Sequence, residues 1–242
     1  MNGIRVAAAL SSVAMAACAV RLGGPSPEEY RATAWPAAAA ATAEATARDL
    51  SELDADIVLL AADRDSAWFA QVAEATELTL SGPGRTGDVA QGFLTRRLEL
   101  LGDTSIVLNV DGGGRLHMHD ALYQISEGRY VDLMLIRIDR DSDLRGSVRT
   151  LLSYIATDVG PTAAVVFGLH AQTPAAADSV AVLLRAAYGD AWECAEADED
   201  DGRSAPPELR LLYGPPARTR CVSANVLSAP GSPVAANLVV GR

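Results

Sequence analysis

The sequence predicts an α+β protein in which two mainly antiparallel sheets pack face to face and carry helices on their outer sides. The 242-residue chain is 49% hydrophobic, which is enough to bury one sizeable core. Apolar runs of strand length outnumber the helical segments, and the helices stand singly between them. Most of these strands are joined by turns too short for a crossover, which argues against a doubly wound parallel sheet.

The first 17 residues have the composition of an export signal. Arg5 is their only charged residue, and an apolar run from 6 to 17 follows it. That run is shorter than the roughly 20 residues that a membrane-spanning helix needs. Met15-Ala16-Ala17-Cys18 resembles the lipobox of bacterial lipoproteins, in which the cysteine is lipidated and becomes the first residue of the mature protein.

We therefore predict a lipoprotein signal peptide at 1–17, lipidation at Cys18 and a Gly- and Pro-rich tether at 18–27. The expected location is the bacterial cell envelope, with the protein anchored to a membrane by lipid. An ordinary secretory signal, or an N-terminal core helix, is the alternative.

Besides the predicted lipidated Cys18, two cysteines remain, Cys194 and Cys221. In an oxidising compartment two leftover cysteines pair more often than they stay free. We predict a disulfide between them, with two buried thiols as the alternative.

The charge of the chain argues against nucleic acid as a partner. The formal net charge is -11, and six acidic residues fall between Glu193 and Asp201, so the surface potential repels phosphate backbones. The acidic run lacks the spacing of a calcium-binding loop, and we interpret it as a solvated loop.

The sequence predicts the positions of the helices, the strands and the turns. Helical spacing predicts four helices, at 37–53, at 66–75 with Ser66 as its cap, at 143–156 and at 176–188. Apolar runs predict nine strands, at 56–60, 92–100, 105–110, 115–126, 130–138, 163–168, 209–213, 220–227 and 234–240. Glycine-rich turns are expected at 81–87, 111–114 and 127–129.

The order and spacing of seven segments resemble the endonuclease/exonuclease/phosphatase family, also called DNase I-like. They are Tyr30–Pro36, Leu53–Ala62, Gly92–Arg97, Leu133–Asp139, Val165–Pro174, Arg210–Tyr213 and Ala229–Val234. The resemblance implies a four-layer α/β/β/α sandwich over residues 28–242. It also implies a domain that cuts phosphoester bonds with a magnesium-type ion.

The family's polar site residues are replaced in this chain. The resemblance places Pro36 where the family has a metal- and phosphate-holding Asn, and Ala62 where it has the principal metal-binding Glu. Arg137 stands at a phosphate-contacting His. Arginine can still hold an anion but cannot act as a general acid.

The later motifs show the same losses. Gly168 and Pro174 survive, but the water-activating Asp corresponds to Leu169 and the transition-state-holding Asn to Ala171. The last two motifs have Leu212 in place of an Asp and Gly231 in place of the catalytic His.

These replacements predict a non-catalytic member of the fold, without a cofactor, that binds an unknown protein or small ligand or serves as a structural protein of the envelope. We expect Ala62, Leu169 and Leu212 to converge in a cleft that is closed and dry. His117 and His119 alternate along one strand and share a face, and we expect them at the surface.

The alternative is a Mg²⁺-dependent hydrolase of phosphomonoesters or phosphodiesters whose active site has moved. The candidate residues for such a site are Asp63, Asp65, Arg137, His170 and the pair His117 and His119. The two hypotheses differ in whether these residues cluster within ligand distance.

Overall fold

The computed structural model describes residues 28–86, 89–139, 142–159, 163–171, 173–194, 209–228 and 232–240. The predicted signal peptide, the lipidation at Cys18, the tether, Gly231 and most of the acidic run lie outside the described residues.

Twelve strands and five α-helices are described. The strands are β1 (Glu28–Pro36), β2 (Ile57–Ala62), β3 (Thr79–Thr86), β4 (Val89–Thr95), β5 (Glu99–Asn109), β6 (Arg115–Ser126), β7 (Arg129–Ile138), β8 (Ala164–His170), β9 (Gly189–Asp190), β10 (Leu209–Gly214), β11 (Thr219–Val226) and β12 (Val234–Val240). The helices are α1 (Ala43–Leu53), α2 (Ser66–Thr76), α3 (Leu144–Tyr154), α4 (Pro174–Leu184) and α5 (Ala191–Cys194), and a π-helical turn, Ile155–Val159, extends α3.

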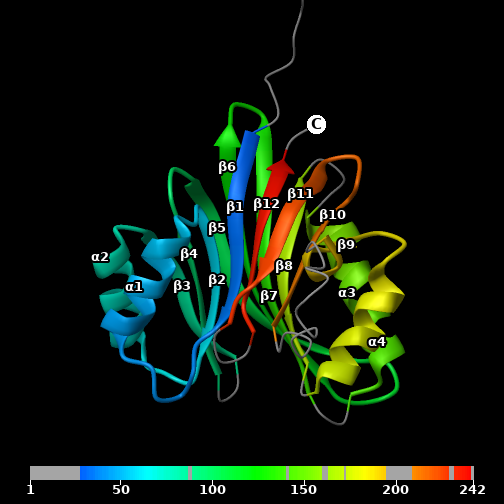
Figure 1. Ribbon diagram of the computed structural model, residues 1–242. Coiled ribbons are helices and arrows are strands. Elements are labelled where there is room, and N and C mark those ends of the chain that lie inside the picture. The colour runs from blue at the N-terminus through cyan, green and yellow to red at the C-terminus, as the bar shows by residue number, and fades with distance from the viewer. Residues whose placement is uncertain are drawn as a thin grey trace, which may run out of the picture.

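The strands form two six-stranded sheets (Figure 1). The first has the order β11-β12-β1-β2-β4-β3, and the second has the order β5-β6-β7-β8-β10-β9. Each sheet contains one parallel pair, β1 with β2 and β7 with β8, and its other pairs are antiparallel. The two parallel pairs both end at the lower edge of the molecule in Figure 1.

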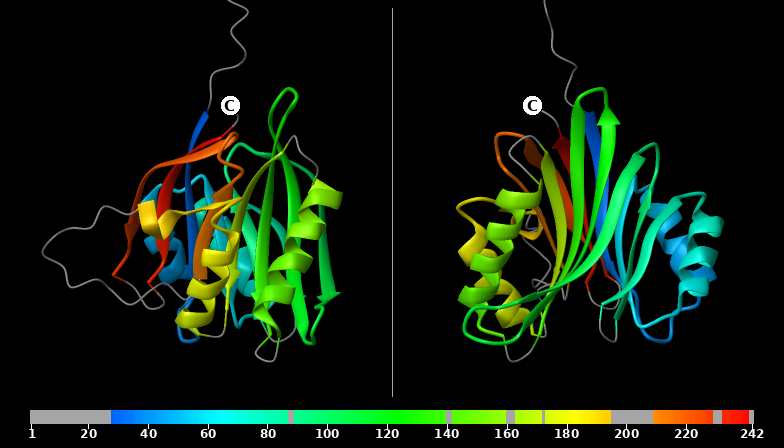
Figure 2. Two further views of the ribbon diagram at one scale, coloured as in Figure 1. Left: turned by 90° about the vertical axis from the view of Figure 1, so that its right-hand side faces the viewer. Right: turned by 180° about the vertical axis from the view of Figure 1, so that it is seen from behind.

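Three hydrophobic cores separate the four layers. The core between the sheets is built from alternate residues of β1, β2, β6, β7, β8, β10 and β12. A second core lies between the first sheet and helices α1 and α2, and a third lies between the second sheet and helices α3 and α4. Figure 2 shows the helices on the two outer sides. The predicted α/β/β/α sandwich is confirmed.

Several predicted boundaries were wrong for local reasons. The expected turn at 81–87 is largely strand β3, because Gly82 adopts a positive φ of 52° and absorbs a shift in register as a bulge. Asp65, not Ser66, caps α2 by accepting a hydrogen bond from the Trp68 amide. The helix expected from residue 37 begins at Ala43, after its cap Thr42.

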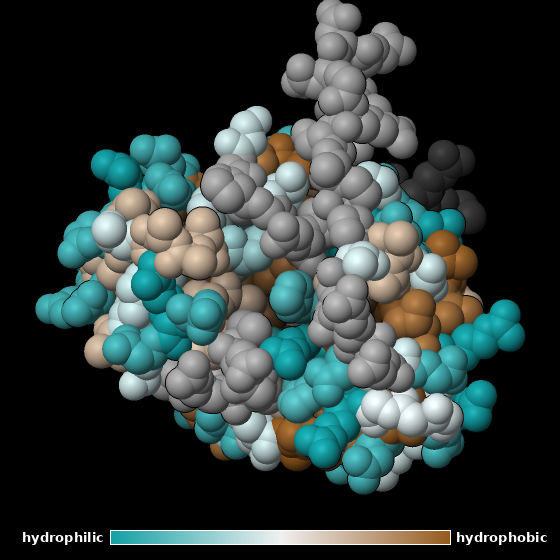
Figure 3. Space-filling view, turned by 90° about the horizontal axis from the view of Figure 1, so that it is seen from below, coloured by the Kyte–Doolittle hydropathy of each residue, from teal (hydrophilic) through white to brown (hydrophobic). Residues whose placement is uncertain are grey.

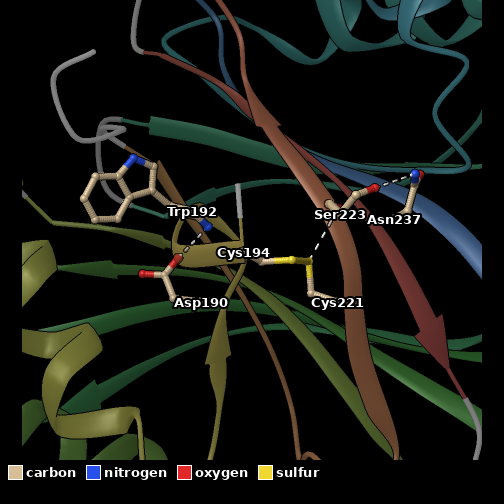
Figure 4. Close-up of a disulfide and its surroundings, with 6 residues drawn as sticks. All are labelled: Asp190, Trp192, Cys194, Cys221, Ser223 and Asn237. Atoms are coloured by element: carbon tan, nitrogen blue, oxygen red, sulfur yellow. Dashed lines mark hydrogen bonds between the residues drawn. A yellow bond between two sulfur atoms is a disulfide. The ribbon is translucent and has the colours of Figure 1, made fainter. Parts of the chain in front are cut away.

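The predicted disulfide is present. It joins Cys194 in the short helix α5 to Cys221 in β11, with their Cα atoms 6.5 Å apart (Figure 4). The disulfide therefore connects the outer edge of the second sheet to an edge strand of the first. Within the described part of the chain, no helix has the length and apolar character to cross a membrane.

Candidate functional site

The candidate site lies at the end of the sandwich where both parallel pairs stop. Pro36 and Ala61, neighbours in the first sheet, lie near the last residues of β1 and β2. On the second sheet the matching positions are Arg137 in β7 and His170 in β8, which are also neighbours. We call this end of the interface between the sheets the mouth. Figure 3 shows this end of the molecule, where hydrophilic and hydrophobic residues are interspersed.

Three basic side chains form a row across the mouth on adjacent strands. His117 of β6 pairs in register with Arg137, and Arg137 pairs with His170. Directly paired residues project from the same face of a sheet, so the three side chains stand side by side. We refer to His117, Arg137 and His170 as the basic row. Alternation with the inward residues Leu133 and Leu135 places it on the face that looks toward the first sheet.

One carboxylate serves two members of the row. Asp139 accepts hydrogen bonds from Arg137 at 3.2 Å and from the His117 Nε2 at 3.1 Å. Burial of Asp139 opposes ionisation, but the hydrogen bonds from His117 and Arg137 outweigh it and hold the pKa of the carboxyl below its ordinary value. Asp139 is therefore ionised and already paired with two members of the basic row.

Arg137 keeps donor capacity that Asp139 does not use. Among the described residues, its buried Nε has no hydrogen-bond partner. The Arg137 side chain is 16% exposed. A buried guanidinium N–H without a partner is costly, so the mouth suits an acceptor that would enter from solvent.

The side chains on the opposite side of the mouth carry no charge. It comes from Ala61 of β2 and its cross-strand neighbour Gln91 of β4, which is fully buried. Pro36 continues the inward-facing series of β1. Strands β2 and β4 both lie against β7 across the interface. The mouth thus has a basic wall and a neutral wall.

Three of the predicted site positions do not lie between the sheets. Ala62 is buried in the core under α1 and α2, whereas Leu169 and Leu212 are buried in the core under α3 and α4. Side chains alternate between the faces of a strand, so a residue one step from an inward position points outward. The expectation that these three converge in one dry cleft is wrong. Ala171 is buried just beyond β8.

The two histidines of β6 are not surface residues, contrary to our expectation. His117 is 7% exposed and His119 is 2% exposed. They do share the inward face, as their spacing indicated, together with Ala121 and Tyr123. Leu116 and Met118 fill the other face of the strand, so the strand has no solvent-facing side at this point.

Other relocated-site candidates do not join the row. Asp63 and Asp65 line a separate surface pocket with Trp68 and Gln71 of α2. Arg64 between them donates to the backbone oxygens of Ala39 and Ala41. Asp65 is already engaged as the cap of α2.

Magnesium does not fit the donors that the described residues offer. This ion prefers an octahedron of oxygen ligands. In the described ranges, no group of three or more His, Cys, Asp and Glu side chains lies close enough to hold a metal ion. The mouth presents nitrogen donors and one paired carboxylate instead.

The fold is shared with solved phosphoesterase-type structures. A crystal structure of an endonuclease/exonuclease/phosphatase family protein from Bacteroides thetaiotaomicron superposes with a TM-score of 0.67 at 11% identity, covering 90% of this chain and all of that one. A mannosyl-6-phosphatase from the same bacterium gives 0.66 at 11% identity, covering 87% and 99%.

A third similar structure is the human Nocturnin catalytic domain with a bound sulfate anion. It superposes with a TM-score of 0.60 at 12% identity, covering 88% of this chain and 93% of that one. At these identities the likeness establishes a DNase I-like fold. No protein-family model and no curated protein sequence matches the chain.

Proposed function

We propose that this protein is an exported, lipid-anchored domain that has lost metal-dependent phosphoester hydrolysis and binds an anionic ligand at the mouth. The observation that carries the proposal is the basic row, in which the buried Arg137 Nε has no partner among the described residues. A phosphate-like anion would accept from this N–H in a charge-assisted contact beside the rings of His117 and His170.

The ligand class follows from geometry and charge. The protein carries a formal net charge of -11, so a large polyanion is repelled over most of the surface. A small anion needs only the local field of the row. Two of the structurally similar proteins are named for a phosphorylated sugar and for a bound sulfate, which is consistent with a small anion here.

The side chains at the mouth support the loss of hydrolysis. The mouth offers no group of carboxylates for a metal ion within the described residues, and its one nearby acid, Asp139, is held by Arg137 and His117. Without a Lewis acid or a free base, water would not be activated at this position.

The test combines binding and turnover in one preparation. Calorimetry of the purified protein with inorganic phosphate, with magnesium and with manganese should give binding of phosphate alone, and a generic phosphodiester should not be hydrolysed. Arg137→Met should weaken phosphate binding by at least about tenfold, since a charged hydrogen bond is worth roughly 1.5–3 kcal/mol.

The matched control is Arg115→Met, which removes an exposed arginine near the same end of the molecule. It should leave phosphate affinity within about twofold, because screened surface charges contribute little. Magnesium-dependent turnover would refute the loss of hydrolysis. Phosphate binding that survives Arg137→Met unchanged would refute the mouth as its site.

The proposed anchor has its own test. Cys18→Ala should release the protein from the membrane fraction of cells that express the full chain. Retention in the membrane fraction would contradict lipidation at this cysteine.

A further inference from the structure

A second polar group lies along the seam between the two sheets, next to the mouth but built from other residues. Ser105 in the edge strand β5 is the direct cross-strand partner of His119 in β6. The Ser105 hydroxyl lies 2.6 Å from the His119 Nδ1. On the other side of the ring, Nε2 lies 3.9 Å from the Asp103 carboxylate. We call Ser105, His119 and Asp103 the seam cluster.

The three residues differ in exposure in the way that a nucleophile and its base require. Ser105 is exposed, His119 is only 2% exposed, and the Asp103 side chain is 39% exposed. A hydroxyl that solvent can reach therefore rests on a buried imidazole. The imidazole in turn faces a carboxylate that can orient it.

The imidazole is held in place from two further sides. The Phe93 ring packs on it with the ring centroids 5.1 Å apart. Gly82 of β3 also closes over the ring, because a Cβ at this position would overlap Nε2. Gly82 has a positive φ as well, so its backbone approach depends on glycine. This packing fixes the orientation of the ring relative to Ser105.

The protonation of the ring suits a base. Burial lowers the pKa of His119 below its ordinary value, and it does so against the opposing charges of Asp103 and Asp120. Neutral imidazole accepts from Ser105 at Nδ1 when Nε2 carries the proton. Nε2 has no hydrogen-bond partner among the described residues, and the Asp103 carboxylate lies 3.9 Å from it, within ion-pair distance.

We propose that the seam cluster is an acyl-transfer site in which Ser105 is the nucleophile, His119 the general base and Asp103 a positioning residue. Val107 lies two residues along β5 on the same face and is 52% exposed, so the site suits an ester with a short apolar acyl chain. This inference does not depend on the proposed anion site, which uses other residues.

The chemistry balances without a cofactor. The Ser105 Oγ attacks the ester carbonyl as its proton passes to His119 Nδ1, and the alcohol leaves with that proton to give an acyl-serine. Water then attacks the acyl-serine, again giving its proton to Nδ1. The carboxylic acid leaves, and Ser105 regains its hydrogen.

A fluorophosphonate probe tests the nucleophile directly. In the expected reaction a bond forms between Ser105 Oγ and phosphorus, the phosphorus–fluorine bond breaks, fluoride leaves, and His119 takes the serine proton. Peptide mass spectrometry of the purified full-length protein should find the adduct on Ser105. Absence of labelling, or labelling that persists in Ser105→Ala, would overturn the proposal.

Variants separate the roles. Thr104→Ala is the matched control, because Thr104 is an exposed hydroxyl on the adjacent residue that pairs with Asp120 on the opposite face. It should label like the wild type, whereas His119→Gln should lower the labelling rate by roughly 100-fold or more. Asp103→Asn should reduce the maximal labelling rate while probe affinity stays constant, since a positioning residue does not bind the probe.

Turnover of p-nitrophenyl butyrate gives a second reading. Ser105→Ala should abolish it, and circular dichroism should show an unchanged fold because the side chain is exposed. Thr104→Ala should leave turnover unchanged. Loss of turnover in Thr104→Ala would contradict the assignment of the nucleophile to Ser105.

Discussion

Two arginines of the second sheet, Arg210 and Arg137, show how the same side chain can serve structure or binding. Arg210 is 1% exposed and donates from Nε to Asp190 at 2.9 Å and from Nη1 to Asp178 at 2.8 Å. Its guanidinium also stacks 4.4 Å from the centre of the Trp192 ring. The Arg210 guanidinium is thus paired with two carboxylates and one aromatic ring.

Arg137 is less buried than Arg210 and has fewer interaction partners. It has one carboxylate, Asp139, which it shares with His117. Its Nε is buried and unpaired among the described residues. A buried charge whose hydrogen-bonding groups are all paired holds elements of the structure together. A buried charge with an unpaired donor is suited to bind a ligand.

The largest effect is expected from Arg210→Met. The change leaves Asp190 buried without its cation, and burial already raises the pKa of that carboxyl despite Arg210. We expect a loss of about 3–5 kcal/mol in the free energy of unfolding, measured by denaturant titration. A loss below about 1 kcal/mol would contradict the structural role of Arg210.

The second-largest effect on stability is expected from removing the disulfide between Cys194 and Cys221. Cys194 lies in the helix that follows Asp190 and carries Trp192 (Figure 4). Replacing both Cys194 and Cys221 with Ser should cost roughly 2–4 kcal/mol, because the bond no longer restricts the unfolded chain. Adding a reductant to the wild type should give the same loss, and it should leave the double variant unchanged.

The buried carboxyl of Asp132 has no cation among the influences that shift its pKa within the described residues, and it should make stability depend on pH. Asp132 lies beside Asp120, whose carboxylate accepts from the Tyr154 hydroxyl. Burial, followed by the hydrogen bond and charge of Asp120, raises the pKa of Asp132 to about 10. The folded state then binds a proton that the unfolded state releases above its ordinary pKa of 3.8.

Stability from this group is therefore fully present below about pH 4 and falls as pH rises toward 10, by at most about 1.4 kcal/mol per pH unit. Thermal unfolding across this range measures it. Asp132→Asn should flatten the slope, whereas Asp178→Asn, which removes a carboxylate paired with Arg210, should not. A slope unchanged in Asp132→Asn would contradict the assignment.

The smallest effect on stability is expected from Arg137→Met. Its partner Asp139 is 30% exposed and can be hydrated when the arginine is lost. We expect a change of less than about 1 kcal/mol in the free energy of unfolding, together with the loss of phosphate binding described above. A destabilisation as large as that of Arg210→Met would show that Arg137 is a structural residue.

Much of the fold could be predicted from the sequence because local patterns encode it. Alternating and continuous apolar runs indicated most of the strands, and the short turns between them indicated antiparallel sheets. The bulged strand β3 was missed because its Gly-Pro-Gly sequence is typical of a turn. The face that each side chain occupies was harder to predict, since a shift of one residue reverses it.

From the sequence alone we could predict the two-sheet architecture and the pairing of Cys194 with Cys221. The packing of the sheets was needed to show that Ala62, Leu169 and Leu212 point away from the mouth. It also placed His117 beside Arg137 and His119 beside Ser105. The physical reason is that composition and periodicity act within a strand, whereas the neighbours of a side chain are set by register between strands that are distant in sequence.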